Sequence, residues 1–224
     1  MGYYIDLKKI SIDQYRDKLT SGYLAPSRMI LKEQPLERFN RFKNIGIKNA
    51  DDLLALLKNK SKISELEKEE LFSGDYLKIL LRELGSLHTK PNKLADFTIV
   101  SKDTIEKLEK IGIKHTEKLF YRVLNENDRK KLSTQTGTSE ADILMLTKLT
   151  DLSRIRWVGA TFAQMIYAVG IDTVEKVTQT DPEDLHREIN TFNKEHSIYK
   201  GHIGLNDMKI LVTIAKEIPL DIEY

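Results

Sequence analysis

One short phrase occurs three times in this chain, and each copy places a glycine between two aliphatic residues. The copies are Ile45-Gly46-Ile47, Ile111-Gly112-Ile113 and Val169-Gly170-Ile171, and their glycines lie 66 and then 58 residues apart. A glycine just after a helix adopts the left-handed conformation at no steric cost, and the apolar residue after it commonly seals that helix end. The repetition therefore predicts stacked supersecondary units, none of which buries its apolar face alone.

The sequence between the phrases has the period of amphipathic helices. Apolar residues recur at three- and four-residue steps in 76–84, 143–149 and 208–215, whereas alternating strand patterns are almost absent. Polar residues with a free acceptor stand where such helices need a cap. The expected caps are Ser139, Asp181 (before Pro182) and Asn206, with Asn49, His115 or Thr116, and Thr173 following the three phrases. The expected fold class is all-α.

Composition excludes several classes of protein. The chain has no cysteine, which rules out disulfide scaffolds, thiolate metal sites and thiol nucleophiles. No apolar run approaches the roughly 20 residues of a membrane span, and residues 1–10 lack the apolar stretch of a signal peptide. The formal net charge is only +2. We therefore expect a soluble, cytoplasmic protein with no membrane association.

Counting back from the glycines suggests how each unit is built. Eleven residues before Gly170 stands Gly159, and the same step leads from Gly112 to Ser101 and from Gly46 to Pro35, where the pattern is poorest. Each unit is expected to run helix, tight turn, helix, glycine stop, helix. The polar segment 88–93 predicts a linker. The expected organisation is a divergent unit in 1–88, a second unit in 94–150 and a third, best-formed unit in 151–224.

The third unit carries the clearest resemblance to a known family. Ile155-x-x-Val158-Gly159-x-x-x-Ala163, followed by Val169-Gly170-Ile171-x-Thr173, resembles the helix-hairpin-helix motif. The whole chain is similar to the helix-hairpin-helix repeat family known as domain of unknown function 4332. Further stretches that carry this likeness are 3–7, 26–31, 76–83, 94–97 and 150–155. The resemblance implies tandem, SAM-domain-like helix-hairpin-helix units stacked as a short helical array, and it implies no activity.

Nucleic-acid-binding members of the wider motif class hold a phosphate on the backbone amides at the start of the second hairpin helix. Carried over to this chain, the resemblance implies that the amides of Gly159, Ala160 and Thr161 are the donors. Two positions depart from the motif, because Trp157 stands in the place of its first glycine and Thr161 in that of a frequent basic residue. A tryptophan takes up positive φ only at a cost, and its side chain is expected to shield the turn.

Basic residues suggest further contacts. Arg154 and Arg156 flank the turn and are candidates to pair with phosphates, the alternative being two solvated arginines on an exposed helix end. Residues 151–224 hold 8 basic and 12 acidic side chains, whereas residues 1–90 hold 17 and 13. Positive potential attracts nucleic acid. The expected main contributors are therefore on the N-terminal face, namely Arg28, Lys32, Arg38, Arg41 and Lys43.

Other features favour ordinary structural roles. Trp157 is a candidate contact for a base or a protein partner, but a packing role is more common for a single tryptophan. The five histidines show no metal-ligand spacing, and no nucleophile elbow supports a hydrolase. We expect no metal, no cofactor and no enzymatic activity.

Two functional hypotheses remain. The first is sequence-independent binding of a nucleic-acid backbone, DNA rather than RNA. The second is a protein-interaction scaffold whose hairpins only pack and in which Trp157 or an inter-unit groove takes the partner. The even charge and the acidic third unit favour the second hypothesis.

Overall fold

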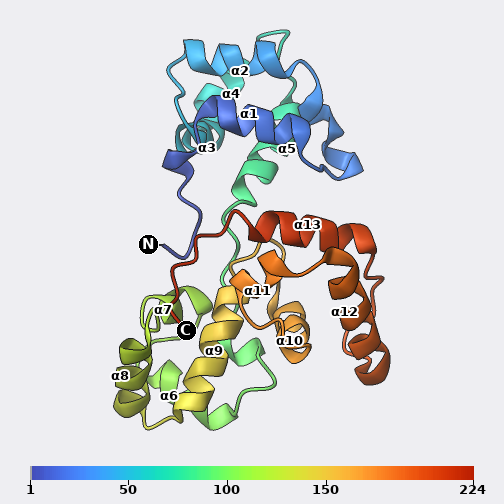
Figure 1. The fold of residues 1–224 in the computed structure, drawn as a ribbon. Helices are drawn as coiled ribbons and strands as arrows, with labels where there is room; N and C mark the ends of the chain where they lie inside the picture. Colours follow the sequence, from blue (N-terminus) through green and yellow to red (C-terminus); the bar gives the residue numbers. More distant parts are fainter. Residues whose placement is uncertain (1) are drawn as a thin grey trace. The chain divides into compact units, whose positions relative to one another are not determined.

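The structure, a computed structural model, describes residues 2–224 and divides into two compact units. We call residues Asp6–His88 the N-terminal unit, and residues 2–5 with Thr89–Tyr224 the C-terminal unit. Regular structure in both units is helical, as the sequence predicts (Figure 1). The segments expected to form the second and third units, 94–150 and 151–224, lie together in the C-terminal unit and share one hydrophobic core.

The N-terminal unit packs its helices around an aromatic and leucine core. Phe39, Phe42, Phe72 and Tyr76 form a chain of ring contacts, with the Phe42 and Phe72 ring centroids 5.1 Å apart. Its helices, including two 3₁₀ helices, are η1 (Leu7–Lys9), α1 (Ile12–Ser21), η2 (Pro26–Lys32), α2 (Pro35–Asn44), α3 (Ala50–Lys58), α4 (Lys60–Leu66) and α5 (Gly74–Gly85).

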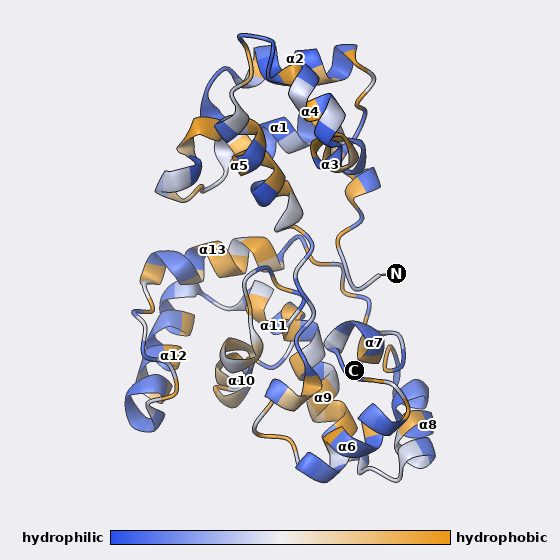
Figure 2. Ribbon diagram, turned by 180° about the vertical axis from the view of Figure 1, so that it is seen from behind, coloured by the Kyte–Doolittle hydropathy of each residue, from blue (hydrophilic) through white to orange (hydrophobic). Residues whose placement is uncertain are grey.

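The C-terminal unit is built around α9, which contacts α7, α8 and α10. Hydrophobic residues of all its larger helices meet in the shared core, and Figure 2 shows them as apolar stretches interleaved with hydrophilic ones. Its helices are η3 (Leu94–Asp96), α6 (Lys102–Lys110), α7 (Thr116–Phe120), α8 (Glu126–Thr136), α9 (Glu140–Leu152), α10 (Ala160–Ala168), α11 (Val174–Gln179), α12 (Pro182–His196) and α13 (Leu205–Ala215). Within residues 2–224, no helix has the length and hydrophobicity to cross a membrane.

The three glycine phrases end α2, α6 and α10, as predicted. Gly46, Gly112 and Gly170 have φ values of 91°, 82° and 81°. After α6 the amide of Gly112 donates to the carbonyl of Glu109 at 2.9 Å, and that of Ile113 to the carbonyl of Leu108 at 3.0 Å. These two bonds form the double closure typical of a glycine-terminated helix. A side chain at these glycines is strained by its own backbone, whatever space surrounds it.

The residue four places after each glycine is held in a similar way. The amide of Ala50 donates to the carbonyl of Ile10 at 2.9 Å, and the amide of Thr116 donates to the carbonyl of Asn92 at 3.0 Å. In the third copy the amide of Val174 donates at 2.9 Å to a carboxylate oxygen of Asp151. A side chain thus replaces the main-chain acceptor of the first two copies.

The helix caps follow the sequence prediction with one exception. Asn49, Ser139, Thr173 and Asp181 cap their helices through the side chain, and His115 occupies a cap position without a side-chain bond. The expected cap at Asn206 is wrong, because that residue lies inside the first turn of α13. The helix begins earlier since the carboxylate of Asp207 accepts from the amide of Gly204 at 3.0 Å.

Candidate nucleic-acid interface

The turn between α9 and α10 places its strained residue at Trp157. Gly159 is the N-cap of α10 in an extended conformation, with φ −79° and ψ 172°, whereas Trp157 has φ 70°. The energetic cost that the sequence analysis assigns to positive φ at a tryptophan therefore applies to this turn. Trp157 adopts the left-handed conformation, which is ordinarily that of a glycine, at a cost of about 1–2 kcal/mol.

The Trp157 side chain points away from the core. It is 55% exposed, and the guanidinium carbon of Arg156 lies 4.0 Å from its ring centroid. Arg156 itself is only 8% exposed, which corrects the alternative interpretation of it as a solvated arginine. Such a cation–π contact contributes about 0.5–2 kcal/mol. It offsets part of the backbone strain, and the remaining ring surface is open to solvent.

Substitutions at Trp157 separate the strain from the stacking. Trp157→Gly and Trp157→Ala both remove the contact with Arg156, but only glycine relieves the left-handed backbone. We expect the glycine variant to be more stable than the alanine variant by about 1 kcal/mol. Urea unfolding of the two variants measures this difference, and equal midpoints would contradict a strained turn.

The N-terminus of α10 is open. The first hydrogen bond of the helix joins the amide of Ala163 to the carbonyl of Gly159 at 2.9 Å. The amides of Gly159, Ala160 and Thr161 have no acceptor among residues 2–224, and Gly159 and Thr161 are exposed. Every other α-helix of the described chain begins with a side-chain cap, an acidic residue in its first turn, or both. The positive end of α10 has neither.

Two side chains outside the turn hold this arrangement in place. The amide nitrogen of Asn92 donates to the carbonyl of Val158 at 3.3 Å and to the hydroxyl of Ser153 at 2.9 Å. Gln164 donates to the carbonyl of Ala160 at 3.2 Å and accepts from the amide of Ile99 at 3.1 Å. Neither residue was a sequence candidate, because Asn92 lies in the polar segment predicted as a linker and Gln164 lies within a helix.

Arg154 is not available to a ligand, which corrects the sequence prediction. The residue is 2% exposed, and its guanidinium donates to Asp151 at 3.0 Å, to Asp221 at 3.3 Å and to the carbonyl of Pro219 at 2.8 Å. It also lies over the Phe120 ring, 4.7 Å from the centroid. Arg154 thus joins the end of α9 to the C-terminal segment and is a buried structural residue.

Asp151 is the buried partner of Arg154. Its carboxylate also accepts from the amide of Val174 at 2.9 Å and from the hydroxyl of Tyr224 at 3.0 Å. Burial raises the pKa of Asp151, while the bond from Val174 and the charge of Arg154 act in the opposite direction. Burial, together with the charge of Asp151, raises the pKa of Tyr224.

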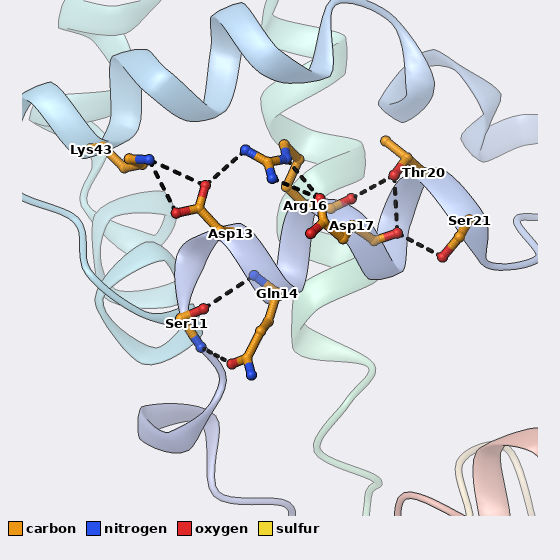
Figure 3. Close-up of polar contacts among 8 residues, drawn as sticks. All are labelled: Ser11, Asp13, Gln14, Arg16, Asp17, Thr20, Ser21 and Lys43. Atoms are coloured by element: carbon orange, nitrogen blue, oxygen red, sulfur yellow. Dashed lines mark hydrogen bonds and ion pairs between the residues drawn. The ribbon is translucent and has the colours of Figure 1, made fainter.

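Within the expected basic face of the N-terminal unit, the prediction is corrected at Arg38, which is buried. Arg38 is 7% exposed; it donates to the carbonyls of Leu71 at 3.0 Å and Glu33 at 2.9 Å and lies over the Tyr76 ring. The other cations of that face are engaged within the unit. The contacts are Arg41 with Glu69 at 2.7 Å, Lys43 with Asp13 at 3.1 Å (Figure 3), Arg28 with Glu83, and Lys32 with the carbonyl of Gly22 at 2.8 Å.

Figure 3 shows how Lys43 is paired with an acidic residue of α1. Asp13 lies between Lys43 and Arg16, and Arg16 also contacts Asp17, so the local array alternates in sign. The hydrogen bond from Lys43 lowers the pKa of Asp13; desolvation opposes this effect, and the charges of Lys43 and Arg16 lower the pKa further. Three cations of the face, Arg28, Arg41 and Lys43, are therefore paired with carboxylates, whereas Lys32 and Arg38 are bonded to neutral carbonyls.

Within residues 2–224, no three histidine, aspartate or glutamate side chains come together as a group able to hold a metal ion. The chemistry that the turn offers is hydrogen-bond donation to an anion.

Comparison with known proteins gives one match. The family model described as domain of unknown function (DUF4332) matches residues 99–218. No curated protein and no solved structure matches the chain.

Proposed function

The chain belongs to the family described as domain of unknown function (DUF4332), and on that premise, which fixes no activity, we propose that it is a non-enzymatic protein that binds nucleic acid through the phosphate backbone. The proposed site is the turn at Trp157 together with the N-terminus of α10.

The architecture that we propose is an array of helix-hairpin-helix units. Its support is the common geometry of two copies: α6 and α10 each span nine residues, and each ends before a glycine of positive φ. Their N-caps, Ser101 and Gly159, both stand eleven residues before that glycine. In the first copy α2 is one residue longer and begins after Gln34, which has φ 45°. This difference accounts for the poorer sequence match of the first unit.

The open N-terminus of α10 is the observation that carries the proposal. Free amides at a helix start, together with the positive end of the helix dipole, bind phosphate. Every other α-helix of the described chain has a side-chain cap or an acidic residue in its first turn, and α10 alone offers an anion a helix start with neither. Backbone amides read no base edges, and binding through them is therefore independent of sequence.

A carboxylate placed at Gly159 tests the site without damaging the fold. A Cβ built on Gly159 meets no atom within 4 Å, and its backbone has the conformation of ordinary N-caps. Gly159→Asp supplies its own acceptor to the helix amides, so we expect stability to be unchanged or raised by a few tenths of a kcal/mol. Affinity for nucleic acid is expected to fall by about tenfold or more, since charge-assisted hydrogen bonds are lost and the new charge repels phosphate.

The measurement is a titration of labelled duplex DNA, single-stranded DNA and RNA at two salt concentrations. Ser101→Asp is the matched control, because it adds the same charge at the equivalent N-cap of α6, where Ser101 already caps the helix. We expect the control to bind as the parent does. Absence of binding by the parent chain at low salt would refute the proposal, as would an affinity that Gly159→Asp leaves unchanged.

The second candidate function is a protein-interaction scaffold. The observation that favours it is the exposure of Ile99 and Trp157, which stand two residues before the N-caps of α6 and α10. Exposed aromatic and aliphatic side chains anchor protein partners. This candidate takes first place if no nucleic acid binds at low salt.

A further inference from the structure

The charges beside the three glycine phrases differ in one copy. Two positions matter, the second and the sixth residue after each glycine. The first copy has Lys48 and Asp52 there, and the third has Asp172 and Lys176, so each of these pairs is neutral. The second copy has two cations, Lys114 and Lys118.

The geometry of the sixth position is the same in two copies, which makes the comparison direct. The ammonium of Lys118 donates to the carbonyl of Gly112 at 3.4 Å, and that of Lys176 donates to the carbonyl of Gly170 at 3.3 Å. Lys176 also pairs with Asp172 at 2.7 Å. Lys118 lacks this carboxylate, because Lys114 stands in its place.

Two more lysines belong to the same region of the C-terminal unit. Lys110 is the last residue of α6, and the backbone of Lys93 forms a bridge with His115, so that the amide of Leu94 donates to the carbonyl of Lys114 at 3.0 Å. We call these residues the lysine cluster: Lys93, Lys110, Lys114 and Lys118. All four are exposed, and none forms an ion pair with another residue of 2–224.

The acid that lies between Lys114 and Lys118 forms no ion pair with either of them. Glu117 lies between Lys114 and Lys118, but its carboxylate interacts with the phenol of Tyr4. Burial and then the charge of Glu117 raise the pKa of Tyr4. Lys114 and Lys118 are like charges close together in sequence with no ion-pair partner within residues 2–224, so an external anion would relieve their repulsion.

We propose that the lysine cluster is the main electrostatic contact for the phosphate backbone of a nucleic acid bound at α10, an inference that rests on the proposed function. Asn92 connects the lysine cluster with the start of α10. It directly precedes Lys93, and its side chain donates to the carbonyl of Val158, which belongs to the same peptide group as the open amide of Gly159. A lysine side chain is a flexible point charge that contacts the phosphates of a nucleic acid and does not distinguish its bases. Such contacts are independent of sequence, as is the proposed contact at α10.

The test is the salt dependence of binding. The double variant Lys114→Gln/Lys118→Gln removes two phosphate contacts. We expect the log–log slope of affinity against salt to become shallower by about two for duplex DNA, or by somewhat less for a single strand. The matched control is Lys48→Gln/Lys176→Gln, which changes the net charge equally at the same positions of the neutral copies. We expect the control to keep the slope of the parent, and circular dichroism to show both variants folded.

The outcomes separate this inference from the proposed function. An unchanged slope in Lys114→Gln/Lys118→Gln, with Gly159→Asp still impaired, overturns the lysine cluster and leaves the site at α10. An equal effect of the control pair also overturns it, because net charge alone would then explain the result. Polyglutamate that competes as strongly as DNA would overturn the assignment to nucleic acid in favour of an acidic protein. Absence of all binding by the parent chain refutes both proposals.

Discussion

Arg154→Met is expected to lower the free energy of unfolding of the C-terminal unit by about 3–5 kcal/mol. The side chain of Arg154 has no exposed surface, and its removal leaves the carboxylates of Asp151 and Asp221 without their cation. Methionine fills much of the volume of the stem but donates no hydrogen bond. The carbonyl of Pro219 then loses its donor, and the C-terminal segment keeps only its bond from Tyr224 to Asp151 as a side-chain link to the end of α9.

Chemical unfolding measures the total effect, and amide hydrogen exchange locates it. Exchange is expected to rise first in residues 2–5 and 219–224, since Arg154 also donates to the carbonyl of Tyr3. The control is Arg187→Gln, which removes an exposed pair with Asp184 and is expected to change stability by less than about 1 kcal/mol. A loss in Arg154→Met no larger than in the control would contradict a stabilising network.

The pH dependence of Arg154→Met follows from Asp151. Burial already raises the pKa of this carboxyl in the folded chain, and loss of the opposing guanidinium raises it further. A folded-state pKa above the unfolded one means that the folded chain holds the proton more tightly. Stability is then greatest below the unfolded pKa and falls as pH rises through the folded pKa. The deficit of Arg154→Met is therefore expected to shrink in acid, and a second substitution, Asp151→Asn, is expected to recover part of it at neutral pH.

The helices and their ends were predictable from the sequence because their causes are local. The φ values of Gly46, Gly112 and Gly170 follow from the absence of a Cβ, and Asp181 caps α12 because its acceptor reaches amides two and three residues on. Asn206 failed as a cap through a competing local interaction, the bond from the amide of Gly204 to Asp207. Such competition is decided by geometry that a list of residue types does not contain.

The burial of Arg38 and Arg154 could not be predicted from local sequence in this way. Arg154 meets partners 65 and 67 residues away in the C-terminal segment and others 151 and 152 residues away near the start of the chain. From sequence alone a charged residue is expected to be exposed, since charged groups are seldom buried without partners. Only the fold shows that the partners converge.

The sequence contains a signal for the lysine cluster, but the net charge of the whole segment does not reveal it. Residues 91–150 hold 11 basic and 9 acidic side chains, a nearly even balance, although their lysines beside Gly112 lack carboxylate partners. Comparing the second and sixth residues after each glycine would have revealed the contrast with the other copies. The backbone conformation of Trp157 could not be predicted in this way. Its positive φ runs against the conformational preference of tryptophan and depends on the turn as a whole.

Arg38→Met is the corresponding prediction for the N-terminal unit, with an expected loss of about 2–4 kcal/mol in the free energy of unfolding. The guanidinium of Arg38 donates to the carbonyls of Leu71 and Glu33, and a buried carbonyl left without a donor costs about 1–3 kcal/mol. The substitution also removes the cation that lies 4.0 Å from the centroid of the Tyr76 ring.

The same helix supplies the control for Arg38. Arg41 stands one turn further along α2 and makes a bidentate pair with Glu69 at the surface, so Arg41→Gln is expected to cost less than about 1 kcal/mol. Hydrogen exchange resolves the effect by unit, with protection lost within residues 6–88 in Arg38→Met and retained in Arg41→Gln. An equal loss of stability in both variants would contradict this prediction. The loss of a positive charge from α2 would then explain the result, and the buried contacts of Arg38 with Leu71 and Tyr76 would not be what holds α5 against α2.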